Sequence, residues 1–309
     1  MSRSPNCRHD RRFFYKYVSA HTAKTILTTR KLRWSSPLRF NDPFDVTQEL
    51  RLNFTDAELR FAVTEEVAGV ILEGARPPDG LNPALKAMLS ELDKQRNPSL
   101  QQEIVDAIRQ DASNGATSGQ IQSLAELRQR WNGIVPMLRI LCLSEVNDVT
   151  SMWHHYAEEY RGVVLQFEAI DALDSVFLMA RPVVYQDALP AIADKGVWAR
   201  CLVREGQAAF VNLFTEYQYV KTTAWAYERE WRLASLARSG ESGLFSDWGF
   251  SPRELSAVYL GPRCSAADES EILALLVHGL EHVTAHRASI RGAIPKFTFE
   301  PLPARSVEG

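Results

Sequence analysis

The segment Trp225–Arg232 (WAYEREWR) limits the fold most, because its charged and aromatic residues alternate. Side chains along a strand point to opposite faces, so Glu228, Glu230 and Arg232 share one face of the predicted strand. Two carboxylates this close repel each other and are costly to bury. Two interpretations stay open: a polar site that acts on a cationic sugar intermediate, or an exposed strand face with local Glu–Arg pairing.

The composition is that of an ordinary globular chain without a strong preference for a charged partner. Its 309 residues suffice for one large domain or two small ones with an ample core. Hydrophobic residues make up 45% and charged residues 24%, which is typical of globular proteins. The formal net charge of -3 gives no global electrostatic pull toward nucleic acid or membrane.

Cysteine usage and the lack of targeting signals favour a reducing cytoplasm. Cys7, Cys142, Cys201 and Cys264 are scattered and form no CxxC pair, so neither structural zinc nor disulfides are predicted. The basic first twelve residues lack an apolar core, which argues against a signal peptide. No apolar run approaches the roughly 20 residues of a membrane span. We therefore expect a cytoplasmic protein without a membrane partner.

Strand-like and helix-like stretches are mixed without regular βαβ repetition, which predicts an α+β fold rather than a doubly wound sheet. The periodicity predicts strands at residues 13–18, 31–35, 138–144, 162–167, 182–185, 257–260 and 297–299, and one near Val283. It predicts helices at residues 20–30, 151–160, 197–217 and 267–280.

Residues 55–136 form a helical zone without a catalytic grouping. Thr55-Asp56-Ala57-Glu58 is a capping box before an amphipathic run, and breaks follow at 76–80 and 113–119. We expect an inserted helical subdomain at 55–136. The α+β core would then comprise 13–54 and 137–302, with flexible tails at 1–12 and 303–309.

Three other patterns in the sequence are candidates for a site. His278, His282 and His286 recur every four residues, but Gly279 and the apolar alternation that follows indicate that the helix ends first, so no metal is expected. No glycine-rich phosphate loop or GxSxG elbow occurs, which disfavours a Rossmann cofactor site. The Asn-Asp-Pro sequence at Asn41 predicts an ordered turn in which Asn41 or Asp42 caps backbone amides.

Several motifs together resemble a known family. They are Tyr15–Tyr17, Phe40–Asp45, Cys142–Glu145, Met152–Ala157, Gly162, Lys221, Trp225–Arg232 and Tyr259–Gly261. In this order, over about residues 13 to 262, they resemble an uncharacterised bacterial domain family that is common near mobile elements and defence genes.

The layout of these motifs is similar to the ADP-ribosyltransferase superfamily, which implies a split, mostly antiparallel sheet and NAD as substrate. Lys16 or Tyr17 would stand where the superfamily has a first-strand His or Arg, a departure from its pattern. Glu228-Arg229-Glu230 would supply its Glu-x-Glu. The resemblance implies a nucleotide site that draws on Lys16, Tyr17, Ser36, Asn41, Asp42, Ser144, Trp153, Tyr156 and Arg232. It also implies a nucleic-acid or protein acceptor, and a cognate antitoxin or phage-defence partner.

The chemistry of such a transfer suits these residues. Breaking a nicotinamide–ribose bond creates an oxocarbenium-like sugar, which a fixed carboxylate stabilises. We assign this role to Glu230, and orientation or deprotonation of the acceptor to Glu228. Arg232 would pair with Glu230 or hold a phosphate. Aromatic side chains such as Trp153 and Tyr156 fit a protein core, and equally a flat nicotinamide or adenine ring.

Two further functions stay open. One is a non-catalytic nucleotide- or partner-binding module on the same fold. The other is a hydrolytic, nuclease-like effector in which Asp42, Asp45, Glu228 and Glu230 hold a divalent ion, since magnesium prefers carboxylates and water. A grouping of Asp42 or Asp45 with Glu230 would favour the metal. An aromatic-lined cleft with Glu230 at its floor and Tyr17 opposite would favour NAD.

Overall fold

The computed structural model describes residues 4–46, 50–73, 83–95, 97–113, 124–187, 193–292 and 296–303. The chain divides into two compact units. The first comprises residues 1–45, 136–187 and 219–309, and the second comprises residues 46–135 and 188–218. Each unit is therefore built from segments that are far apart in the sequence.

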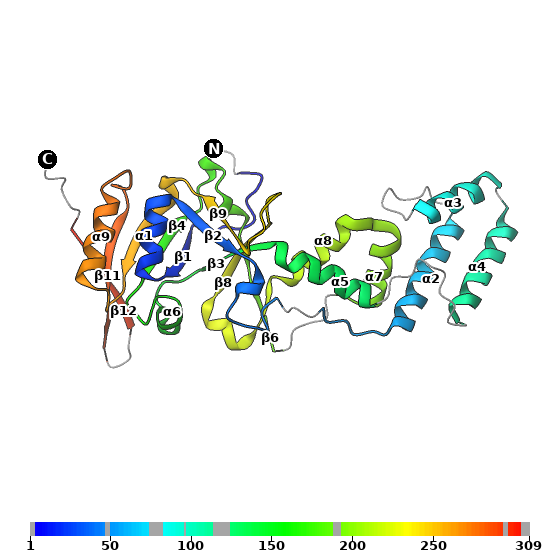
Figure 1. Cartoon of the computed structure of the whole chain (residues 1–309), viewed down its shortest axis with the longest axis horizontal. Helices are drawn as coiled ribbons and strands as arrows, with labels where there is room; N and C mark the ends of the chain where they lie inside the picture. Colours follow the sequence, from blue (N-terminus) through cyan, green and yellow to red (C-terminus); the bar gives the residue numbers. More distant parts are fainter. Residues whose placement is uncertain are drawn as a thin grey trace. The chain divides into compact units, whose positions relative to one another are not determined.

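A mostly antiparallel sheet forms the first unit (Figure 1). Its main path runs, in spatial order, through β12 (Lys296–Pro301), β11 (Thr284–Arg291), β10 (Leu255–Leu260), β4 (Val163–Glu168), β1 (Phe13–Val18), β3 (Leu138–Ser144), β2 (Lys31–Ser35) and β9 (Phe245–Gly249). Two more strands join it, β8 (Glu230–Leu236) beside β3 and β5 (Arg181–Pro182) beside β8. A separate parallel pair joins β6 (Val184–Gln186) to β7 (Val220–Thr222).

One parallel crossover interrupts the antiparallel order. Strands β10 and β11 pair in parallel, and α9 (Ala266–Leu276) connects them. A parallel pair needs such a long connection, because a tight hairpin can only join antiparallel strands. Ser265 begins α9 by accepting a hydrogen bond from the Asp268 amide, as an N-cap serine does.

Helices cover both faces of this sheet. Helices α1 (Ala20–Thr29) and α9 share one apolar core with the strands, whereas α6 (Thr150–His155) packs in a second core on the opposite face. Strand β4 shows why both faces need covering. Val163, Leu165 and Phe167 enter the first core, and Val164 between them enters the second. This two-residue alternation buries β4 on both sides.

The sheet splits beside β3. Strand β8 pairs with β3 along its whole length, from Leu138 to Ser144, and so occupies one edge of β3. The other edge meets β1 only at Tyr15 opposite Ser144, and β2 only at Ser35 opposite Ile140. Between these two points β1 and β2 diverge, and no described strand pairs with β3 on that edge.

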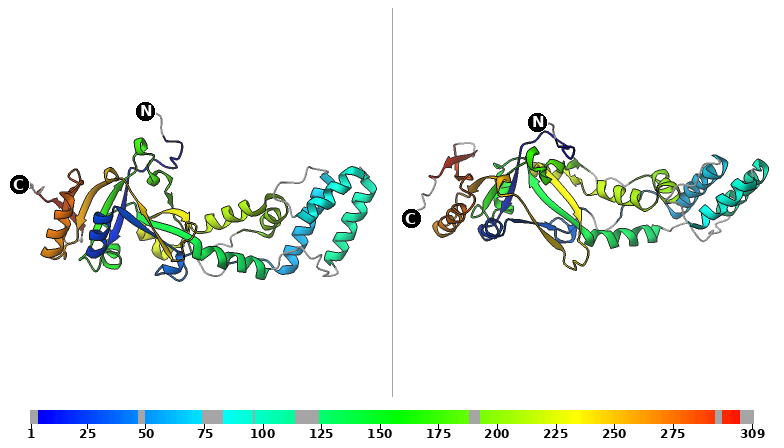
Figure 2. Two further views of the ribbon diagram at one scale, coloured as in Figure 1. Left: turned by 45° about the horizontal axis from the view of Figure 1, so that its top comes forward. Right: turned by 90° about the horizontal axis from the view of Figure 1, so that it is seen from above.

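The second unit is helical (Figure 2). Ion pairs connect α2 to α4 through Glu65 and Arg109, to the α7–α8 segment through Glu66 and Arg204, and to Lys195 of α7 through Glu58. Thr55 and Glu58 form the capping box that the sequence predicts. The helices are α2 (Asp56–Glu73), α3 (Pro83–Gln95), α4 (Pro98–Ser113), α5 (Leu124–Ile134), α7 (Lys195–Arg200) and α8 (Gly206–Tyr217), with a π-helical turn at Cys201–Glu205.

The α+β class and the mostly antiparallel sheet are confirmed, and the bounds differ in places. The second unit takes in 188–218, which the sequence grouped with the sheet. The helix predicted over 197–217 contains the π-helical turn. Residues 4–12, expected as a tail, bond to a neighbouring segment, for example through the Arg8 amide and the Leu178 carbonyl. The predicted tail at 303–309, except residue 303, and most of the breaks at 76–80 and 113–119 lie outside the described residues.

The predicted strand around Glu228 begins later than expected. Residues Thr223–Glu228 form a 3-10 helix, and β8 begins at Glu230. Arg229 between them has a left-handed conformation with φ of 43°, which turns the chain from the helix into the strand. The strand interpretation of 225–229 was therefore wrong, because this turn interrupts the alternation.

Among the described residues, no helix combines the length and the apolar character needed to cross a bilayer.

Two glycines fix the junction of β4, β10 and α6, and they yield a test. The Gly261 amide donates to the Gly162 carbonyl at 2.9 Å. A Cβ on Gly162 would stand 2.2 Å from the Val18 oxygen, and one on Gly261 would stand 2.1 Å from the Tyr160 oxygen. We expect Gly162→Ala and Gly261→Ala to lower the free energy of unfolding by about 1–3 kcal/mol, as overpacking does. Chemical denaturation would measure the loss.

Gly249→Ala is the matched control, because its added Cβ would lie 3.8 Å from the nearest atom, the Arg30 oxygen. Equal stability of all three variants would contradict the close backbone approach.

Candidate functional site

A cavity of about 410 Å³ lies at the split in the sheet. It takes side chains from β1, β2 and β3 on either side of the divergence, and from α6, β7 and the Glu228–Glu230 turn. Ligand pockets commonly measure about 300–1,000 Å³, so this cavity is at the small end of that range. Its lining is Tyr15, Lys16, Tyr17, Arg33, Ser35, Arg39, Phe40, Asn41, Asp45, Ile140, Cys142, Leu143, Ser144, Met152, His155, Tyr156, Lys221, Glu228 and Glu230.

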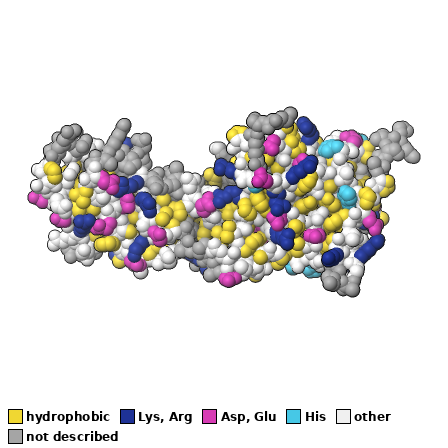
Figure 3. Space-filling view, turned by 180° about the vertical axis from the view of Figure 1, so that it is seen from behind, with side chains coloured by type: hydrophobic (Ala, Val, Ile, Leu, Met, Phe, Trp, Pro, Cys, Tyr) yellow, Lys and Arg dark blue, Asp and Glu magenta, His cyan; other side chains and the backbone are white. Residues whose placement is uncertain are grey.

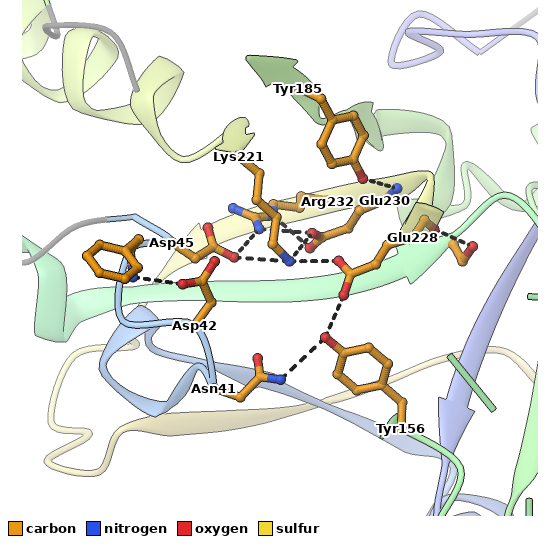
Figure 4. A network of polar contacts seen from close by, with 11 residues as sticks. Asn41, Asp42, Asp45, Tyr156, Tyr185, Lys221, Glu228, Glu230 and Arg232 are labelled. Carbon is orange, nitrogen blue, oxygen red and sulfur yellow. Dashed lines mark hydrogen bonds and ion pairs between the residues drawn. The ribbon is translucent and has the colours of Figure 1, made fainter. Parts of the chain in front are cut away.

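Five charged side chains form a buried network at one end of this cavity (Figure 4). Lys221 Nζ donates to Glu228 at 2.6 Å and to Glu230 at 3.2 Å, and lies 3.5 Å from Asp45. Arg232 Nε donates to Glu230 at 2.7 Å, and Arg232 Nη2 donates to Asp45 at 2.5 Å. All five are at most 6% exposed, so the interpretation as a solvent-exposed strand face was wrong.

The network contains three carboxyl groups and two permanent cations, and its carboxyl groups differ in pKa. Burial opposes ionisation of Glu230, but the charges of Arg232 and Lys221 outweigh it and lower its pKa to about 2. For Glu228 and Asp45, burial is the larger effect and raises the pKa. Glu230 is thus held as a carboxylate, while Glu228 and Asp45 are easier to protonate than usual.

Local backbone contacts fix the two glutamates. The Glu230 amide donates to the Tyr185 hydroxyl at 2.8 Å, and the Ser144 hydroxyl donates to the Glu228 carbonyl at 2.7 Å. The register places Ser144 opposite Glu230 across β3 and β8. Glu228 ends the 3-10 helix and Glu230 begins β8, with the left-handed Arg229 between them, and both carboxylates contact the Lys221 ammonium.

Tyr156 connects the network to the open part of the cavity. Its hydroxyl donates to Glu228 Oε1 at 2.6 Å and accepts from the Asn41 amide at 3.4 Å. Burial, and then the charge of Glu228, raise the pKa of Tyr156. Tyr156 therefore stays protonated and serves as a hydrogen-bond donor.

Of the residues expected at a nucleotide site, seven line the cavity: Lys16, Tyr17, Asn41, Ser144, Tyr156, Glu228 and Glu230. The other four do not. Ser36 is fully buried and caps a 3-10 turn, Asp42 caps the Phe44 amide, and Trp153 is fully buried with its ring nitrogen on the Asn147 carbonyl. Arg232 lies beneath the lining, paired with Asp45 and Glu230 rather than free for a phosphate.

Sequence reasoning did not assign Lys221 or Tyr185 to a site, and it considered Asp45 only for metal. Lys221 lies nine residues before Glu230 and is one of the motif residues. This membership is the signal in the sequence that could have assigned Lys221 to the site. Asp45 is 187 residues from Arg232 in the sequence, and local sequence patterns do not predict a contact over such a separation. Tyr185 acts through its hydroxyl on a backbone amide, a contact that periodicity does not predict.

The histidines that recur every four residues do not share one helix. Helix α9 ends at Leu276, His282 contacts the Pro252 and Leu255 carbonyls, and His286 lies in β11. In the described ranges, no three His, Cys, Asp or Glu side chains are grouped to hold a metal ion. Asp45 and Glu230 belong to one group of side chains, and Arg232 and Lys221 contact both of them as counter-ions.

The lowered pKa of Glu230 predicts how stability depends on pH. Its contribution is fully present above the unfolded value of about 4.5 and is lost as the pH falls toward about 2. We expect Glu230→Gln to reduce stability at about pH 7 by on the order of 3 kcal/mol. The deficit should shrink as the pH falls below about 4.5. Chemical denaturation at several pH values would measure it.

Glu300→Gln is the control for this series, because Glu300 forms an exposed pair with Arg291. A Glu230→Gln deficit that stays constant with pH would refute the assignment of a buried, ionised Glu230.

The turn at Asp42 was predicted and is confirmed, since Asp42 Oδ1 accepts from the Phe44 amide at 2.9 Å. We expect Asp42→Ala to lower the free energy of unfolding by about 1 kcal/mol, as for a lost cap, and Asp42→Asn to lower it less. Thermal denaturation would compare the two. If ligand binding were lost at unchanged stability, Asp42 would contact the ligand instead of the backbone.

Comparison with known proteins relates part of the chain to a protein family. The chain matches nothing among the curated proteins or the solved structures. Residues 152–233, which run from α6 through the Lys221–Arg232 part of the charged network, match the family described as "Protein of unknown function (DUF2971)".

Proposed function

We propose that this chain binds NAD in the cavity at the split of the sheet and transfers ADP-ribose to a nucleic acid or a protein. The observation that carries the proposal is the position of Tyr17 and Glu230 in one aromatic-lined cavity. A cavity that combines aromatic side chains with an ionised carboxylate suits the flat rings and the ribose of NAD. Tyr15, Phe40 and Tyr156 complete the aromatic part of the lining, and flat rings stack on such side chains.

The order of elements supports the same reading. Lys16 and Tyr17 lie on the first strand, then α1 and β2 follow, then β3 with Ser144 and α6 with Tyr156, and finally β8. This sequence of elements is the one that the resemblance to ADP-ribosyltransferases implies. The resemblance itself rests on motifs and order, and the family match carries no activity with it.

The two glutamates suit different steps. A carboxylate that remains ionised can stabilise an oxocarbenium-like sugar, and the low pKa of Glu230 provides one. An acid–base group works best with a pKa near the working pH, and burial raises that of Glu228 in this direction. Tyr156 and Lys221 hold Glu228 from two sides and would orient it toward an acceptor.

One observation favours a second function, a non-catalytic nucleotide-binding module. Both oxygens of Glu230 already accept hydrogen bonds, Oε1 from Arg232 and Oε2 from Arg232 and Lys221. A carboxylate held in this way serves structure as well as chemistry. Catalysis would then be absent although the cavity and its ligand remain.

The surface gives no preference for a nucleic-acid acceptor on the face that Figure 3 shows. Basic and acidic side chains are interspersed there, without a single-sign stripe. The proposed acceptor class rests on the resemblance alone. The same holds for a proposed antitoxin or phage-defence partner.

Glu228→Gln and Glu230→Gln separate the two functions. With NAD as substrate, and under conditions where the variant stays folded, we expect Glu230→Gln to reduce turnover by about 10²–10⁴-fold with little change in NAD affinity, because its proposed contribution to the reaction is made in the transition state. Glu228→Gln should impair transfer more than NAD hydrolysis. Calorimetry with NAD, with and without Mg²⁺, measures binding, and release of nicotinamide measures turnover.

Glu168→Gln is the matched control, since Glu168 is a partly buried carboxylate paired with Arg12 outside the cavity lining. If the wild type binds NAD but does not turn it over, the result supports the non-catalytic binding module. Absence of NAD binding would reject the transferase, and binding of Mg²⁺ alone would favour a hydrolytic effector.

A further inference from the structure

The charges that line the cavity are unevenly distributed. Every lining carboxylate belongs to the buried network and is matched there by Lys221 or Arg232. Three further cations line the same cavity, namely Lys16, Arg33 and Arg39. These three do not contact the network carboxylates through any ion pair among the described residues.

Lys16 is half-buried and has no acidic partner in the part of the chain described. Its ammonium donates to the Cys142 carbonyl at 2.8 Å, in the stretch where β3 lacks a strand partner on that edge. An ammonium has three donors, and this contact uses one. A partly desolvated cation without a counter-ion is costly, and a bound anion would remove that cost.

Arg39 differs from Arg33 in its partners. Arg33 makes a bidentate pair with Asp247 and lies over the Phe245 ring. Arg39 follows β2 at the end of a 3-10 turn, is exposed, and has neither an ion pair nor a side-chain hydrogen bond within the described ranges. Its guanidinium is therefore available to a ligand, and its fork geometry matches phosphate oxygens.

We infer that Lys16 and Arg39 form an anion subsite that holds the phosphate or pyrophosphate of a nucleotide, while its sugar lies toward Glu228 and Glu230. The identification of the nucleotide as NAD rests on the proposed function. The anion subsite rests on the two cations alone. In this subsite Lys16 contacts the phosphates. Arg39, which is not one of the motif residues, contacts them as well.

The test compares ligands with and without phosphates. We expect Arg39→Gln and Lys16→Gln each to weaken NAD and ADP-ribose binding about 10-fold, a loss typical of one charge-assisted hydrogen bond. Binding of nicotinamide riboside, which has no phosphate, should change by less than about 3-fold. Arg161→Gln is the control, since Arg161 is exposed, pairs with Glu159, and does not line the cavity. Calorimetry and thermal denaturation would accompany each variant.

Inorganic pyrophosphate distinguishes the two proposals. If the wild type binds pyrophosphate but not NAD, and Arg39→Gln removes that binding, the anion subsite stands and the proposed function fails. If the wild type binds NAD and both folded variants bind it equally well, the subsite is wrong and the proposed function stands. An equal loss of nicotinamide riboside and NAD binding would also overturn the subsite, because the cations would then act on the shape of the cavity.

Discussion

The ion pairs of Lys221 and Arg232 with three buried carboxyl groups hold the candidate site together. Removing two permanent charges from water is costly, and it is repaid only when each charge meets well-placed partners. Arg232 does so by contacting Asp45 and Glu230, and Lys221 by reaching Glu228 as well. The network connects the segment before residue 46, strand β7 and strand β8, so these three parts depend on one another.

The split in the sheet creates the cavity that the charged network lines. Because β1 and β2 leave β3 between Ser144 and Ile140, the Cys142 carbonyl loses its usual strand partner. Lys16 replaces that partner with its ammonium. A buried backbone carbonyl must be satisfied, so a donor is required at this position. The need to satisfy the Cys142 carbonyl thus places the Lys16 ammonium in the cavity that the charged network also lines.

The sequence predicts most elements of the first unit because their patterns are local. Strands at residues 13–18, 31–35 and 138–144 appear where the two-residue alternation indicates them. It does not predict the turn at Arg229, because Glu228, Glu230 and Arg232 alternate as they would in a strand. It also cannot pair Asp45 with Arg232, since that contact closes over 187 residues and depends on the register of β3 and β8.

The turn at Arg229, which the sequence pattern does not predict, places Glu228 and Glu230 in different surroundings. In an uninterrupted strand, Glu228 and Glu230 would point the same way from one sheet face and would share one environment. The left-handed Arg229 separates them, so Glu230 meets Arg232 and Glu228 meets Tyr156. Burial raises the pKa of Glu228, whereas at Glu230 the charges of Arg232 and Lys221 outweigh burial and lower the pKa. Two carboxyl groups with different protonation behaviour can take different roles, which a uniform acidic strand could not supply.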